Sequence, residues 1–71
     1  MENGEQNYIG ETIERFRLQR GMSIRSLADS VSMQEEALFL SLLGKRKLTA
    51  TELIKIMQTL KMSFKDFNLP A

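Results

Sequence analysis

Residues that end and begin helices divide this 71-residue chain into short segments. Gly21 precedes Ser23, and Gly44 precedes the pattern Thr49-x-x-Glu52. Such a glycine ends a helix in the left-handed conformation, and the following Ser or Thr caps the next helix. Because each intervening segment has room for only a few turns, the chain predicts a fold of several short helices.

Apolar residues recur at helical spacing inside these segments. Ile9, Ile13 and Phe16 share one face of the first segment, which we expect to be helical from Ile9 to about Arg20. Further helices are expected from Ser23, from Gln34 to Leu43, from Thr49 to Leu60 and, briefly, from Ser63 to Phe67. No stretch alternates as a strand does. The prediction is therefore an all-α, compact five-helix bundle.

The domain boundaries follow from the polar ends of the chain. Residues 1–8 are predicted to be a flexible N-terminal arm, residues 9–68 the helical domain, and residues 69–71 a C-terminal tail.

Composition excludes several classes of function. The chain has no Cys and no His, so thiolate or imidazole zinc sites, disulfides and His-based catalytic triads are excluded. No membrane span or signal peptide is visible, which favours a cytoplasmic protein. We expect no enzyme activity, no cofactor and no small-molecule ligand. The net charge of +1 gives no global indication of nucleic acid.

The order and spacing of the caps and apolar residues are specific over most of the chain. The residues that carry the pattern are Ile9, Gly10, Glu11, Phe16, Arg17, Gly21, Met22, Ser23, Leu27, Ala28, Val31, Leu38, Gly44, Lys45, Arg46, Leu53, Ile56, Leu60, Met62, Ser63 and Phe67. This arrangement resembles the Cro/phage-repressor (XRE) type of helix-turn-helix family. The resemblance implies a small DNA-binding transcriptional regulator whose second and third helices form the helix-turn-helix, and a dimer that spans two half-sites of double-stranded DNA.

The resemblance also implies where DNA would be contacted. Gln34 and Glu35 start the third helix, where base edges are read, and a carboxylate can accept a hydrogen bond from cytosine. Arg25 and the loop Lys45, Arg46 and Lys47 would hold phosphates.

Four positions depart from the family pattern. Ile24 stands where the family often has a glutamine that holds a phosphate. Ser32 stands where the turn between the second and third helices usually has glycine, which predicts a modest left-handed strain. Lys61 stands where another glycine is usual. Leu42 occupies the position of a glutamate that commonly pairs with the Arg17 position. We therefore expect Arg17 to turn to solvent or to pair with another acid.

The third helix is apolar on two sides. Leu38, Ser41 and Leu42, together with Gln34, are expected to face inward. Glu36, Phe39, Leu40 and Leu43 share the opposite side, where the family keeps polar base readers.

This second side has several interpretations. It could be core, a homodimer interface, or a binding site for another regulatory protein. In the last case the chain would be a protein-binding module, such as an antirepressor or regulatory partner, with little or no DNA affinity. Burying one Phe or Leu gains about 1.5–3 kcal/mol, which favours contact with protein.

Overall fold

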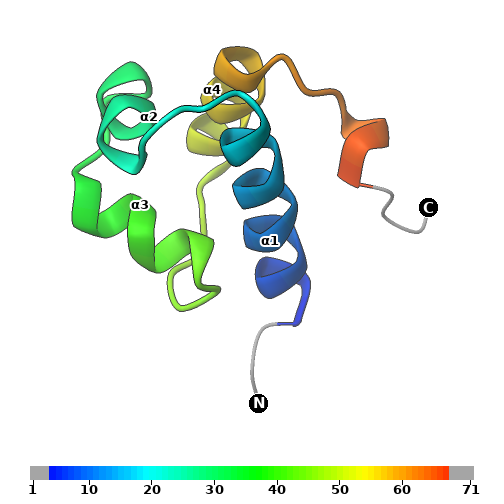
Figure 1. Cartoon of the computed structure of the whole chain (residues 1–71). Coiled ribbons are helices and arrows are strands. Elements are labelled where there is room, and N and C mark those ends of the chain that lie inside the picture. The colour runs from blue at the N-terminus through cyan, green and yellow to red at the C-terminus, as the bar shows by residue number, and fades with distance from the viewer. Residues whose placement is uncertain (1–3, 68–71) are drawn as a thin grey trace.

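The computed structural model describes residues 4–67, which form four α-helices and one 3-10 turn (Figure 1). The elements are α1 (Gly4–Gln19), α2 (Ile24–Ser30), α3 (Glu35–Leu42), α4 (Ala50–Leu60) and the turn η1 (Phe64–Phe67). No strand occurs in this part of the chain. The all-α class is confirmed, but the predicted fifth helix is only a 3-10 turn. A four-residue segment is too short to establish an α-helical ladder.

Local capping explains where the helices begin. The side chain of Ser23 accepts a hydrogen bond from the Ser26 amide, and Thr49 forms a full capping box with Glu52. Ser63 donates its amide to the Asp66 carboxylate over 2.7 Å, which is half of the same motif. The caps predicted at Ser23 and Thr49 are therefore present, and the one at Ser63 is present in part.

The first helix starts earlier than predicted. Residues 4–8, which we assigned to a flexible arm, are the first turns of α1, so that part of the prediction is wrong. Gln6 is almost fully buried and donates to the backbone oxygen of Ser41 over 3.0 Å. The amide of Leu48 in turn donates to the Gln6 side chain over 3.3 Å. These contacts anchor the segment to distant parts of the chain. The predicted arm residues 1–3 and tail residues 69–71 lie outside the described residues.

One hydrophobic core joins the helices. Its buried members are Ile13, Leu27, Ala28, Val31, Leu38, Leu42, Ile56, Met57, Leu60, Met62 and Phe67. The first helix contacts α3, α4 and η1, so it is the central element of the packing. Leu27, Ala28 and Val31, which belong to the pattern that carries the family resemblance, are all buried in this core.

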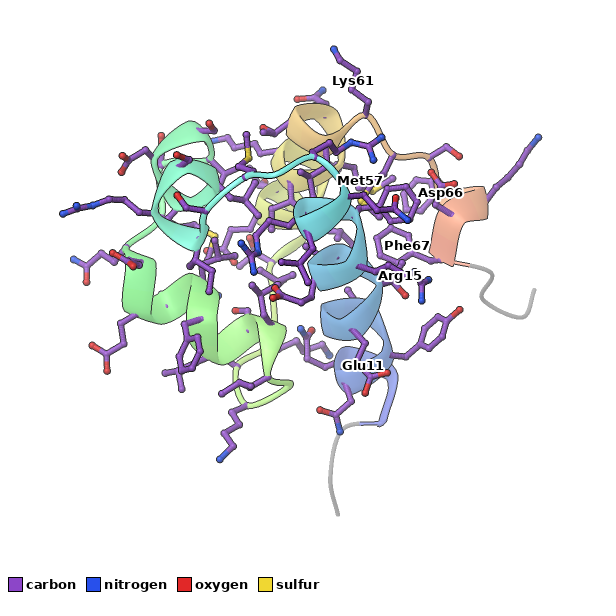
Figure 2. All side chains as sticks on the ribbon, viewed as in Figure 1. Glu11, Arg15, Met57, Lys61, Asp66 and Phe67 are labelled. Carbon is purple, nitrogen blue, oxygen red and sulfur yellow. The ribbon has the colours of Figure 1, made fainter. Side chains whose placement is uncertain are left out.

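The helix α1 separates the pair α2 and α3 from the turn η1. In Figure 1 the helices α2 and α3 occupy one side, and η1 occupies the other. Figure 2 shows Phe67 between η1 and α1, where the residue is 1% exposed. The turn therefore closes the core on the side away from α3 and leaves the outward side of α3 uncovered.

The helix α1 approaches the end of α3 closely at Gly10. A Cβ atom at this position would lie only 2.9 Å from the carbonyl carbon of Leu42 and 2.9 Å from the Ser41 carbonyl oxygen. Both are backbone atoms at the end of α3, so they cannot rotate away. The absence of a side chain at Gly10 allows α1 to hold α3 in place.

No helix within residues 4–67 is long and apolar enough to cross a membrane.

Candidate nucleic-acid interface

The helices α2 and α3 are joined by a tight turn. Ser32 has a φ of 60°, so the strained left-handed conformation predicted for it is confirmed. The amide of Met33 donates to the carbonyl of Ala28 over 2.9 Å and closes the turn. Lys61, the other residue that replaces a glycine, ends α4 with a φ of 58°. The backbone therefore keeps both left-handed turns despite their side chains.

The helix α3 has one buried and one exposed side. Leu38, Ser41 and Leu42 are buried, as predicted, whereas Phe39 is 46% and Leu43 is 48% exposed. Leu40 is half-buried. The interpretation of this apolar side as core is therefore wrong for Phe39 and Leu43, because the protein's own packing leaves them in contact with water.

The N-terminal end of α3 presents polar side chains to solvent. Gln34 is exposed and caps the helix without a side-chain hydrogen bond, so its predicted inward orientation is wrong. Glu35 and Glu36 are also exposed. Arg25 lies across the turn with its Nε atom 4.0 Å from Glu35 Oε1. The sequence-predicted contacts Arg25, Gln34 and Glu35 are thus brought to one end of α3.

The pair between Arg25 and Glu35 is loose. Their side chains are 79% and 58% exposed, and such pairs contribute between zero and about 1 kcal/mol because water screens them. The Arg25 side chain therefore remains accessible, and its charge partly offsets the negative charge of Glu35.

A hollow lies between α2 and the start of α3. It is lined by Ile24, Glu35, Glu36 and Phe39. The lining combines two apolar side chains with two carboxylates. A hollow of this composition suits a partner group that has an apolar stem and a positive end.

The loop after α3 carries the basic residues. Lys45 and Lys47 are exposed. The amide of Lys45 donates to the Leu40 carbonyl over 2.9 Å, and Gly44 ends the helix with a φ of 79°. This helix-ending turn fixes where the loop leaves α3. Two cations therefore lie beyond the C-terminal end of the exposed side.

Arg46 is partly exposed, and its guanidinium is bound to neighbouring side chains of the fold. Its guanidinium donates to the Glu52 carboxylate over 3.1 and 2.9 Å, and to Ser41 Oγ over 3.0 Å. The hydrogen bonds from Arg46 lower the pKa of Glu52 below its ordinary value. These hydrogen bonds to Glu52 and Ser41 compete with the predicted phosphate contact of Arg46, which stays a prediction.

The same carboxylate links the loop to α4. Glu52 accepts from the Thr49 amide over 2.9 Å as part of the capping box while it also binds Arg46. The loop is thus tied at both ends, to Ser41 of α3 and to the first turn of α4. We infer that Arg46 positions Lys45 and Lys47.

Arg17 pairs with Glu14 rather than with a residue at position 42. It is buried, and its Nε atom donates to Glu14 one turn earlier over 3.0 Å. Arg17 also donates to the carbonyl of Met22. The prediction of an alternative partner is confirmed, and Leu42 takes part in the core instead.

Two further arginines of the first helix have identifiable surroundings. Figure 2 places Arg15 on the side of α1 that faces η1. The guanidinium carbon of Arg20 lies 5.1 Å from the centre of the Phe16 ring.

Sequence reasoning missed two residues that hold α3 in place, Gln6 and Gly10. Gly10 gave a usable signal, since a glycine in the middle of a helix usually has a packing reason. Gln6 gave none, because its two partners are 35 and 42 residues away in the sequence.

Comparison with solved structures identifies the fold. The chain superimposes on the clp gene regulator ClgR from Corynebacterium glutamicum with a TM-score of 0.87 and 20% identity, covering 96% of this chain and 72% of that one. It superimposes on a point mutant of the restriction-modification controller protein C.Esp1396I with a TM-score of 0.84 and 26% identity, covering 96% and 86%. Models of known protein families and the curated proteins give no match.

The architecture is that of a Cro/repressor-type helix-turn-helix domain. The helices α2 and α3 form the helix-turn-helix, and the expected fold is confirmed.

Proposed function

We propose that this protein is a DNA-binding transcriptional regulator that places α3 against double-stranded DNA. The observation that carries the proposal is the solvent-facing side of α3 on a helix-turn-helix scaffold, with the exposed lysines Lys45 and Lys47 just beyond its end. The two similar structures belong to a gene regulator and a controller protein, which supports the same class of function.

The proposed contacts with DNA are of two kinds, contacts to phosphates and contacts to base edges. Lys45, Lys47 and Arg25 bind phosphates and fix the position of the protein. Gln34 and Glu35 meet base edges, where glutamine reads adenine and a carboxylate accepts from cytosine. Phe39 is suited to the methyl group of thymine, since apolar side chains read that group in the major groove.

Reversing the charge of the loop after α3 tests the proposal. The double substitution Lys45→Glu with Lys47→Glu should abolish retention of duplex DNA fragments. Lys55→Glu with Lys65→Glu is the matched control, because it makes the same charge change at exposed residues of α4 and η1. The control should bind with only a modest loss. Absence of DNA retention by the unaltered protein at low salt, or equal losses in both variants, would refute the proposal.

The base-reading assignment has its own test. Replacing thymine by deoxyuridine in a bound duplex removes only the methyl group. If Phe39 reads that group, the substitution should weaken binding of the unaltered protein about fivefold or more and leave binding of Phe39→Ser unchanged.

A second candidate function is supported by the exposure of Phe39 and Leu43. In this case the chain is a protein-binding module on the same fold, and α3 grips a partner instead of DNA. If this second function is correct, the unaltered protein should retain no DNA. It should instead form a complex with a protein partner, and the double substitution Phe39→Ser with Leu43→Ser should abolish that complex while the helical content persists.

A further inference from the structure

We propose that the exposed side of α3 binds the same side of a second copy of this chain, with the two helices antiparallel. The pairing masks the proposed base-reading surface, so self-association and DNA binding exclude each other. The self-association does not depend on DNA; only this consequence rests on the proposed function.

The apolar part of the surface supplies the attraction. Phe39 and Leu43 are each nearly half exposed, and Leu40 lies between them on the same side of the helix. Phe39 in α3 and Leu43 at its C-cap stand four residues apart, which is the spacing that brings two side chains together on one side of a helix as an apolar strip. Pairing two such strips removes both from water.

The charged residues at the two ends of this strip indicate that its partner is a second copy of the chain. The acids Glu35 and Glu36 stand at its N-terminal end, and Lys45 stands beyond its C-terminal end. Glu35 and Lys45 lie five residues to either side of Leu40, so a two-fold axis at Leu40 places each acid opposite a lysine of the other copy. A parallel arrangement would instead bring like charges together. Antiparallel helix dipoles add to the preference.

The hollow at the start of α3 fits the same partner. Ile24 and Phe39 provide apolar walls, and Glu35 and Glu36 provide negative charge. A lysine has an apolar stem and a positive end, which is the shape and chemistry that this lining accepts. The Lys45 amide is hydrogen-bonded to the Leu40 carbonyl, so its backbone is held one turn from the proposed axis.

The expected dimer is weak. Two short helices in contact bury less than the ~1,200 Å² of a standard interface, so the dissociation constant should be on the order of micromolar or higher. A weak dimer can be displaced by DNA, whereas an obligate one could not.

Sedimentation over a series of protein concentrations tests the pairing. The unaltered chain should shift from monomer towards dimer as its concentration rises. Leu43→Ser should raise the dissociation constant at least tenfold. Ile54→Ser is the matched control, because Ile54 of α4 is 47% exposed but lies outside the proposed contact, and it should leave the constant unchanged.

Charge reversal tests the antiparallel register. A chain with Glu35→Lys and Glu36→Lys, or one with Lys45→Glu, should be monomeric alone. Mixing the two should restore dimers, since every contact between the different chains then joins opposite charges. A single chain with all three changes should also dimerise.

Several results would overturn the proposal. These are a strict monomer at concentrations up to about 1 mM, equal effects of Leu43→Ser and Ile54→Ser, or no recovery when the charge-reversed chains are mixed. Because no DNA is present, these outcomes do not depend on whether the protein binds DNA. Conversely, loss of DNA retention would leave the sedimentation result unchanged.

Discussion

Replacing Gly10 by alanine should have two opposing effects on the free energy of unfolding. In a free helix the change would stabilise the folded state by about 1 kcal/mol, because alanine has the higher helix propensity. In this fold the added methyl group would meet backbone atoms of Ser41 and Leu42 at 2.9 Å. Real side chains avoid such approaches, and overpacking of this kind costs about 1–3 kcal/mol.

Because backbone atoms cannot move aside as a flexible side chain can, the cost should lie in the upper part of this range, about 2–3 kcal/mol. The net effect of Gly10→Ala should therefore be destabilising by about 1–2 kcal/mol. The melting temperature should fall by about 4–16 °C in a domain of this size. Thermal and urea unfolding followed by circular dichroism measure both quantities.

Glu11→Ala is a suitable control for this experiment. Glu11 is exposed and adjacent in the same helix, so its replacement should change stability by no more than about 0.5 kcal/mol. A Gly10→Ala protein that is more stable than the unaltered one would refute the close approach of α1 to α3.

Two further predictions concern acid titration and backbone strain. The pKa of Glu52 is lower in the folded than in the unfolded state, so its stabilising contribution is complete above the unfolded pKa and is lost as the pH falls through the folded value. Urea unfolding at a series of acidic pH values should show a steeper loss of stability in the unaltered protein than in Glu52→Gln; parallel curves would contradict the assignment. Ser32→Gly should stabilise the protein by about 0.5–1 kcal/mol because glycine adopts the φ of 60° without strain, whereas Ser32→Ala should give no gain in the same unfolding assay.

The sequence was most informative where structure is determined locally. The Ser23 cap, the capping box of Thr49 and Glu52, and the left-handed Gly21 all depend on residues a few positions apart. Such interactions can be recognised from the spacing of residues in the sequence. The helix boundaries predicted at these caps were accurate to within one or two residues.

Long-range contacts set the features that the sequence did not predict. Gln6 belongs to α1 because it bonds Ser41 and Leu48, and no local pattern reports such partners. Arg46 lies in a basic run, which suggested a phosphate contact, but folding brings Glu52 to its guanidinium. Charge in a sequence therefore did not distinguish a solvent-facing lysine from an arginine that stabilises the loop.

The exposed side of α3 shows both the value and the limit of periodicity. The spacing of Phe39, Leu40 and Leu43 correctly separated them from the buried Leu38 and Leu42. Spacing alone could not decide between burial inside the protein and burial against a partner, because both require the same apolar side chains. Their exposure in the fold removes the first interpretation for Phe39 and Leu43.

The most direct test of a functional α3 surface is amide chemical-shift perturbation by NMR on addition of duplex DNA at low salt. The account predicts that the largest changes fall on residues 34–47, which cover α3 and the basic loop, with Arg25 close by across the turn. Changes concentrated on α4 and η1, or no changes at all, would contradict it.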